Sequence, residues 1–404
     1  MLFKVNILSN NYNWYLLATI WLLSMAANFI VAAPMPMTGL LISTLNLSHA
    51  DAGLLIALSP LMYIVLSIPS GIIADRWSVR KIVGTGAILM AVGGILRGFA
   101  STTPTLFIFT IVAGSGVALT IPNLPKMIAT WFPPGKIGLA TGVYVTSFAL
   151  SPAIVFAITP SLLLPVFDNW GNVFLVYGLF ALLTAILWWI ISRDSVKLTH
   201  KRQKIGLKFS VLNILKIRDL WFLGYITTTT NILWYSISSW LPFILISRGF
   251  DPVAAGLVVA LYTLAGTPAL IFFPVISDKI GLRKPFIWLP LLILGPIAYL
   301  LPFSHESNIW LISAIFGILV CSVFTLMFIV PIERVGIERA GSAMGFVLSI
   351  GYIGGLLGPW LVGYLSDLLN EFETSFLIIV VATEVAMILG IIIKETGSRQ
   401  LLSR

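Results

Sequence analysis

The chain has 404 residues, of which 58% are hydrophobic and only 10% are charged. A soluble globular domain carries about 25% charged residues, so this composition excludes an ordinary water-soluble protein. The formal net charge is +9, but in so apolar a chain we expect the basic residues to mark one side of a membrane. The single cysteine, Cys321, lies in an apolar run, which excludes a disulfide within the chain and a cysteine metal site.

Apolar runs of about 20 residues, the length that a helix needs to cross a bilayer, recur along the whole chain. The first set of predicted spans covers roughly 14–43, 51–74, 81–100, 104–130, 137–163 and 170–191. The second set covers roughly 219–247, 253–276, 285–303, 308–332, 340–366 and 374–394. The polar stretch between the sets is predicted as a linker, which gives three parts: 1–191, 192–218 and 219–404.

The two sets of spans repeat one another in sequence. The charged stretch 75–81 returns as 278–284, 203 positions later. An alignment of 52–81 with 255–284 needs no gap and gives 11 identities in 30 positions. A second half that repeats the first is typical of a duplicated membrane bundle.

The positions of Lys and Arg predict the orientation in the membrane. If the two termini, both charged loops and the linker share one side, 22 of the 24 Lys and Arg residues lie there. Only Arg97 and Arg248 then lie at the other side. We therefore expect a multi-pass protein of the plasma membrane with both termini in the cytoplasm. An even number of spans, such as twelve, places both termini on one side.

The arrangement of the spans resembles the major facilitator superfamily over essentially the whole chain. This superfamily has two homologous halves, a basic central linker and the motif Gly-x-x-x-Asp-Arg/Lys-x-Gly-Arg-Arg/Lys after the second span. Gly71, Asp75 and Arg76 match the motif, whereas Arg80 and Lys81 stand one place later than expected. The resemblance implies an all-α integral membrane fold, with twelve transmembrane helices in two pseudo-symmetric six-helix bundles.

The charged loops of the two halves are predicted to form a cytoplasmic gate. A carboxylate such as Asp75 is stabilised at the N-terminus of a helix, here one of the opposite half. The basic residues beside it can pair with acids such as Glu333 or Glu338. In the alternative interpretation they are positive-inside charges without a gating role. The predicted gate consists of Gly71, Asp75, Arg76, Arg80, Lys81, Asp278, Lys279, Arg283 and Lys284.

The fourth and fifth spans carry a narrower resemblance, to the cyanate, nitrate and organic-anion porters of the superfamily. It rests on 114–118 (Gly-Ser-Gly-Val-Ala), 131–134 (Trp-Phe-Pro-Pro) and 138–142 (Gly-Leu-Ala-Thr-Gly). Lys126, near the inner end of the fourth span, can attract an anion, or else it anchors the span at the membrane surface. We expect the substrate to be a small organic or inorganic anion.

Ionisable residues inside the spans are functional hypotheses by default. Glu384, in the middle of the last span, is a candidate for coupling to a proton or sodium ion, or else a structural carboxyl group. Arg97, near the outer end of the third span, is the second coupling candidate, unless it snorkels to lipid headgroups.

Neutral polar and aromatic residues must supply the other substrate contacts, and they are densest in the seventh span. The superfamily resemblance implies that the first, fourth, seventh and tenth helices line the cavity. The predicted substrate-binding residues are Asn28, Asn123, Lys126, Tyr144, Asn231, Trp234, Tyr235, Tyr262 and Tyr352.

No phosphate-binding glycine loop is present and the three histidines lie in separate loops, so we expect no cofactor, no metal site and no enzyme activity. We expect a monomeric carrier, secondary active or facilitative, that works by rocker-switch alternating access. Its partners would be a small-molecule substrate, the lipid bilayer and a coupling proton or sodium ion, but no nucleic acid. The alternatives are a carrier or exporter of a neutral or amphiphilic solute, and a membrane sensor that transports nothing.

Overall fold

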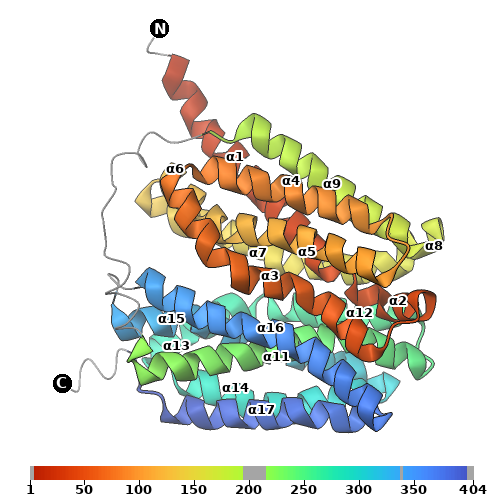
Figure 1. Ribbon diagram of the computed structural model, residues 1–404. Helices are drawn as coiled ribbons and strands as arrows, with labels where there is room; N and C mark the ends of the chain where they lie inside the picture. Colours follow the sequence, from red (N-terminus) through yellow and green to blue (C-terminus); the bar gives the residue numbers. More distant parts are fainter. Residues whose placement is uncertain (1–3, 194–214, 337–339, 398–404) are drawn as a thin grey trace. The chain divides into compact units, whose positions relative to one another are not determined.

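The computed structural model describes residues 4–193, 215–336 and 340–397 of the chain. These residues form helices joined by short loops, without a strand among them (Figure 1). Eleven helices of this part of the chain are long and apolar enough to cross a membrane. The predicted seventh span is a further helix, α11 (Arg218–Ser247), which has 30 residues but is less apolar because of its hydroxyl and amide side chains. The prediction of an all-α membrane fold is confirmed.

The helices of the first half follow the predicted spans. Three of these spans are interrupted by short 3₁₀ or π turns at Pro36, Pro122 and Pro160, because proline lacks the N–H that continues a helix. The elements are α1 (Lys4–Ala32), η1 (Met35–Met37), α2 (Thr38–Leu45), α3 (His49–Arg76), α4 (Val79–Arg97), α5 (Thr103–Thr120), η2 (Ile121–Asn123), α6 (Leu124–Trp131), α7 (Pro134–Ile158), η3 (Thr159–Leu163), α8 (Leu164–Phe167) and α9 (Trp170–Ile191).

The helices of the second half begin and end at recognisable signals. The Asp251 carboxylate accepts hydrogen bonds from the backbone N–H of Val253 and Ala254 and so starts the eighth span. Gly281 ends that span with φ +74°, in the left-handed region that favours glycine. The elements after α11 are α12 (Pro252–Gly266), α13 (Ala269–Ile280), α14 (Pro285–Leu300), η5 (Leu301–Phe303), α15 (Glu306–Val335), α16 (Ala340–Leu369) and α17 (Phe372–Ile392).

The repeat seen in the sequence is also a repeat of helix packing. In the first half α4 packs on α5 and α9, and α1 packs on α7 and α9. In the second half α14 packs on α15 and α17, and α11 packs on α16 and α17. These are the same four pairs of spans, counted within each half. The two halves therefore share one internal architecture, as the duplication predicted.

The chain forms two compact units whose limits differ from the halves of the sequence. One unit comprises Met1–Pro34 and Leu61–Lys204, and the other comprises Met35–Pro60 and Ile205–Arg404. The end of the first span and the start of α3 therefore pack with the second-half helices. The predicted division at 192–218 stays a prediction, since most of that linker lies outside the described residues.

Candidate functional site

The break in the fourth span creates a polar cluster in the first unit. The side-chain amide of Asn123, in η2, is fully buried and donates to Ser70 Oγ of α3 at 3.2 Å and to Leu119 O at 3.0 Å. One turn later, Lys126 Nζ donates to Gly71 O of α3 at 3.0 Å. Two predicted substrate-binding residues and a predicted gate residue thus lie together, where a broken helix crosses α3.

The other predicted substrate-binding residues of the first unit lie on α1 and α7, which pack together. Asn28 donates to Ser24 O of its own helix at 2.8 Å. A buried hydrogen bond of 2.7 Å joins the hydroxyl groups of Ser24 and Ser147. Tyr144 is buried on α7 and contacts Phe148 edge to face. The Ser24–Ser147 bond therefore joins α1 to α7 about one helical turn from Asn28 and Tyr144.

The predicted residues of the second unit gather around α11. Trp234 contacts the Tyr262 ring of α12 edge to face, with ring centroids 5.6 Å apart, and Tyr262 is hydrogen-bonded to Ser238. Asn231 is buried and donates to Thr227 O at 3.0 Å. Tyr235 packs against Gly355 of α16. The structure thus brings four of the five second-unit predictions into one neighbourhood, with Tyr352 half-buried on the adjoining α16.

Most of the Ser and Thr hydroxyl groups of α11 bond the backbone of their own helix. The Thr227, Thr230 and Ser239 hydroxyls donate to the carbonyl four residues earlier, at 2.6–2.8 Å. The Ser236 hydroxyl is fully buried and has no hydrogen-bond partner among the described residues. The many hydroxyl groups of α11 can therefore be explained by hydrogen bonds within a buried helix. They do not by themselves mark a binding site.

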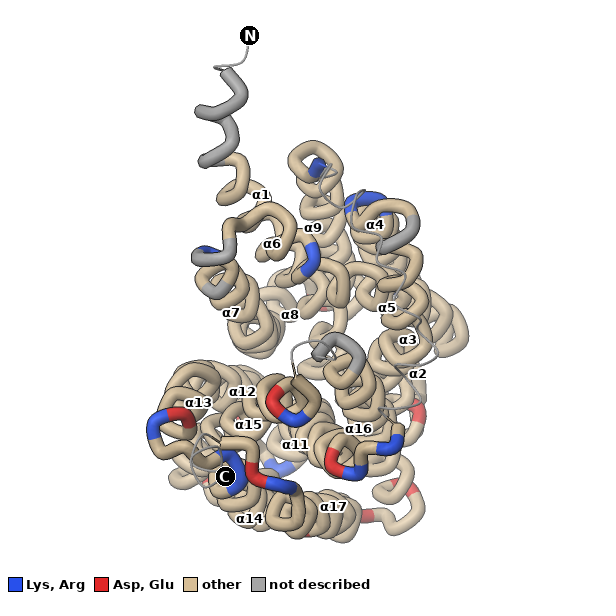
Figure 2. The backbone as a smooth tube through the Cα atoms, turned by 90° about the vertical axis from the view of Figure 1, so that its left-hand side faces the viewer, with Lys and Arg blue, Asp and Glu red and all other residues tan. Residues whose placement is uncertain are grey.

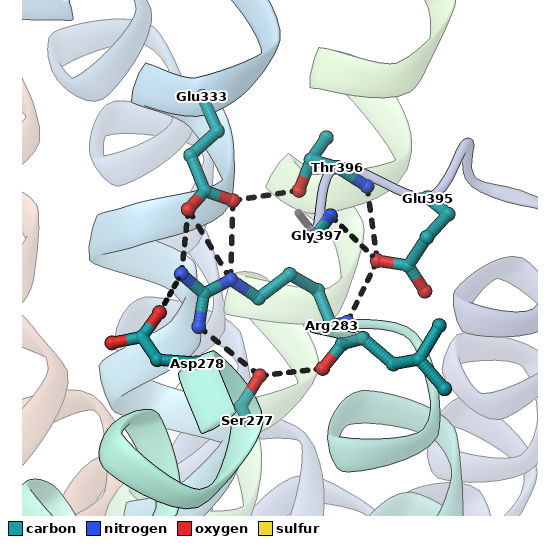
Figure 3. A network of polar contacts seen from close by, with 8 residues as sticks. Ser277, Asp278, Arg283, Glu333, Glu395, Thr396 and Gly397 are labelled. Atoms are coloured by element: carbon teal, nitrogen blue, oxygen red, sulfur yellow. Dashed lines mark hydrogen bonds and ion pairs between the residues drawn. The ribbon is translucent and has the colours of Figure 1, made fainter. Parts of the chain in front are cut away.

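A network of charged groups closes one end of the second unit, which we call the basic end (Figure 2). Arg283 Nη2 donates to Glu333 Oε1 at 2.6 Å and also to Asp278. Its Nη1 donates to Ser277 Oγ at 3.1 Å (Figure 3). The Arg283 side chain is only 7% exposed, whereas that of Asp278 is 60% exposed. Glu333 is therefore the main counterion of a buried guanidinium.

The charges around Arg283 stabilise its ionised form. Burial alone lowers the pKa of the guanidinium, but the hydrogen bonds and charges of Glu333 and Asp278 outweigh it. The pKa of Arg283 consequently lies above its ordinary value. This cation stays charged at every pH at which the protein would work.

The segment after the last helix joins this network through Glu395. Its carboxylate accepts from the backbone N–H of Arg283 at 2.7 Å and of Lys284 at 3.2 Å. It also accepts from the N–H of Gly397 at 2.9 Å, and the Thr396 hydroxyl donates to Glu333 at 2.7 Å (Figure 3). The C-terminal segment therefore fixes the loop that carries Arg283.

The corresponding loop of the first unit is held without an acid. Arg80 donates to Trp189 O at 2.8 Å and to Ser192 Oγ at 3.3 Å, and stacks on the Trp189 ring at 5.3 Å. Glu333, which was expected to pair with the basic residues of the first loop, is bound by Arg283. Lys81 and Lys279 are exposed. The side chains of Asp75 and Arg76, and Glu338 altogether, lie outside what the structure describes, so the gate stays a prediction.

The two coupling candidates lie in different surroundings. Arg97 is 1% exposed, donates to Ile30 O at 3.0 Å and lies 4.7 Å from the Phe174 ring centroid. Its burial rules out snorkelling to the headgroups. Glu384 is half-buried, with its carboxylate against the backbone of Gly295 in α14. Glu384 therefore lies where α14 packs on α17.

Three polar residues of these sites were missed by the sequence analysis. Ser70 is the partner of Asn123, Glu395 holds the second charged loop, and Asp367 binds His49 at the other end of the unit. Glu395 had a detectable signal, because it is an acid on the side predicted to be basic. The described residues contain no group of three His, Cys, Asp or Glu that could hold a metal ion.

The profile of the Major Facilitator Superfamily matches residues 19–359 and 247–401. The chain belongs to this superfamily. It is therefore a multi-pass membrane transporter, and the superfamily prediction is confirmed, while the narrower resemblance to anion porters stays a prediction. Proteins of this family bind small-molecule substrates within the membrane and are not enzymes.

Curated relatives carry different substrates in their names. The chain is 27% identical to the uncharacterized transporter YycB of Bacillus subtilis over 344 residues, 84% of this chain and 83% of that protein. It is 25% identical to a 2-nitroimidazole transporter of Escherichia coli, covering 95% and 96%. It is 24% identical to a probable sulfoacetate transporter of Cupriavidus necator, covering 87% and 85%.

A solved structure shares the fold. It is a bacterial homologue of the human lysosomal transporter Spinster, captured in an inward-facing, unoccupied conformation. It superposes with a TM-score of 0.82 over 94% of this chain and 96% of that chain, at 17% sequence identity. At this identity the likeness supports the fold and not the substrate.

Proposed function

We propose that the chain is a secondary active or facilitative transporter of a small organic or inorganic anion, working by alternating access. In this proposal the basic end faces the cytoplasm of a cell whose plasma membrane holds the protein, and both termini also lie in the cytoplasm. The distribution of Lys and Arg supports this orientation.

The position of Lys126 carries the proposal of an anionic substrate. Its ammonium group is held at 3.0 Å from a backbone carbonyl, beside the buried amide of Asn123 and next to a break in the fourth span. Broken helices and their polar groups are typical of substrate sites in transporters. Two relatives at similar identity are named for substrates of different kinds. One is named for sulfoacetate, an anion, and the other for 2-nitroimidazole.

Flux in proteoliposomes tests this function. We expect a saturable uptake of an anion by the native protein and at least a tenfold loss in Lys126→Gln, which keeps a polar side chain, shorter by one atom, but removes its charge. The matched control is Lys136→Gln, ten residues later and exposed, which should transport normally. Unchanged uptake by Lys126→Gln would show that Lys126 does not bind the substrate.

The aromatic cluster of α11 and α12 supports a second candidate, the transport of a neutral or amphiphilic solute. Trp234 and Tyr262 offer a stacking surface without a charge. In that case Trp234→Ala would abolish uptake of a planar solute, while Lys126→Gln would leave it intact. The third alternative, a sensor that transports nothing, is set aside because the chain belongs to a transporter superfamily.

Glu384 is the proposed coupling group if transport is driven by protons. We expect Glu384→Gln to transport down the substrate gradient but no longer to respond to a pH gradient. An unaltered response would remove Glu384 from the mechanism. Arg97→Lys tests Arg97, the other coupling candidate, because it keeps the positive charge but loses the planar set of guanidinium donors.

A further inference from the structure

A polar contact at the end of the second unit opposite the basic end joins α3 to α16. Asp367 Oδ1 accepts from His49 Nδ1 at 2.6 Å and from the His49 backbone N–H at 3.1 Å. Its Oδ2 accepts from the Ala50 backbone N–H at 2.7 Å. One carboxylate thus binds both the first turn of α3 and the ring of its first residue.

Close helix packing surrounds this contact. A Cβ atom added to Gly53 would lie 2.3 Å from Pro359 O, and one added to Gly363 would lie 2.3 Å from His49 O. The backbones of α3 and α16 therefore meet through glycines on both helices. Trp240 Nε1 of α11 donates to Pro359 O at 3.0 Å and adds a third helix to the contact.

The His49 ring lies among aromatic rings but is open to water. Its centroid is 5.1–5.8 Å from those of Trp240, Phe243 and Phe372. The side chains of His49 and Asp367 are still 30% and 31% exposed. They line a cavity of about 200 Å³ together with Ser366, Asn370, Glu371 and Phe372. A proton can therefore reach the pair without passing through the protein.

The charged groups nearest to His49 are acids. Asp367 comes from α16, Glu371 from the residue before α17, and Asp51 from α3 itself, where it binds the Ser48 hydroxyl at 2.8 Å. Arg248, at the end of α11, donates instead to the carbonyls of Pro302 and Ser304. Protonating His49 therefore adds a positive charge in an acidic setting.

We infer that His49 and Asp367 form a proton-sensitive latch, which holds the start of the second span on the eleventh span more tightly when His49 is protonated. The neutral His49 ring already donates to an ionised carboxylate, and protonation of the ring adds the attraction between two opposite charges to this hydrogen bond. The latch binds residues 35–60, which belong to the first half of the sequence, into the second unit. In alternating access this end must also open, so acid would favour the closed state.

The inference rests on the proposed function only in that this end opens during transport. Cysteine labelling tests the latch without a substrate. A failure of the latch hypothesis can therefore be distinguished from a failure of the proposed anion transport. In a Cys321→Ser background, Ser366→Cys places a thiol at a buried position of the cavity, where the native residue is 3% exposed. Labelling by a maleimide then reports opening of the latch.

The rate is divided by that of Ser307→Cys, an exposed position at the start of α15, to remove the effect of pH on thiol chemistry. Between about pH 5.5 and about pH 7.5, the range that brackets histidine titration, we expect this ratio to rise about fivefold in the native latch. Asp367→Asn should give the high ratio at both values of pH.

His49→Gln and His49→Asn keep a neutral hydrogen-bond donor and should remove the dependence of the ratio on pH. The test needs only one of these two variants to fold. The matched control is His305→Gln, an exposed histidine outside the cavity, which should keep the full dependence. A ratio that does not change with pH in the native latch, or that changes equally in the His49 variants, would overturn the inference.

Discussion

The two copies of the charged loop place equivalent arginines in opposite electrostatic settings. Arg283 is buried, bound by Glu333 and Asp278, and covered by the C-terminal segment. Arg80, which aligns with it in the repeat, binds a carbonyl, a hydroxyl and the face of an indole ring. Both copies of the motif thus keep the arginine, but its partners differ. Arg283 is held by two carboxylates, whereas the groups that hold Arg80 in the described part of the chain are neutral.

The largest effect should follow the loss of the second arginine. Arg283→Leu leaves Glu333 without its counterion at a partly buried position, which typically costs about 3 kcal/mol of unfolding free energy. Equilibrium unfolding of the purified protein measures the change. Lys279→Leu, which removes an exposed charge in the last turn of α13, should stay within about 0.5 kcal/mol. Equal losses in the two variants would contradict the comparison.

Glu395→Gln should have the next largest effect. It removes the charge from a group that accepts hydrogen bonds from backbone N–H groups of Arg283, Lys284 and Gly397, and we expect a loss of about 1.5 kcal/mol. The neighbouring exposed residue offers the control Lys394→Gln, expected to be neutral. If hydrogen exchange of the 281–284 amides did not speed up in Glu395→Gln, the C-terminal segment would not hold this loop.

Arg80→Ala should cost less, about 1 kcal/mol, because the guanidinium has neutral acceptors and a half-exposed ring beneath it. The same unfolding measurement compares it with Arg283→Leu. A loss as large as that of Arg283→Leu would mean that the first loop has an acidic partner in solution.

The smallest effect concerns pH. A cation whose pKa is raised on folding contributes stability that is complete below its unfolded pKa and is lost only as pH rises through the folded pKa. Since the pKa of Arg283 lies above its ordinary value, the difference in unfolding free energy between native protein and Arg283→Leu should stay constant from about pH 7 to about pH 10. A difference that shrinks over this range would assign the effect to another group.

Much of the fold could be predicted from the sequence, because span length and the repeat of 52–81 in 255–284 are local or periodic signals. The partners of the charged residues could not be predicted in this way. Arg80 contacts Trp189, and His49 binds Asp367, which lies 318 positions later. No sequence pattern distinguishes these residues from other polar residues near the ends of spans. The close packing of Gly53 and Gly363 explains the second pair only once α3 and α16 are seen together.

The candidate binding residues show the same limit. Polar residue types singled out α11 as a source of substrate contacts, yet most of its Ser and Thr hydroxyl groups bond the backbone of the same helix. Asn123 and Lys126 form a polar cluster because they bind Ser70 and Gly71 of α3. These residues are neighbours only in the folded chain.

Thermal unfolding of the native protein and of Lys126→Gln, screened against small anions, cations and neutral metabolites, tests the central claim most directly, because a ligand of the native state raises its melting temperature. We expect at least one small anion to stabilise the native protein and not Lys126→Gln, while Lys136→Gln behaves as native. Stabilisation by neutral solutes alone, or equal stabilisation of Lys126→Gln by the anion, would contradict it.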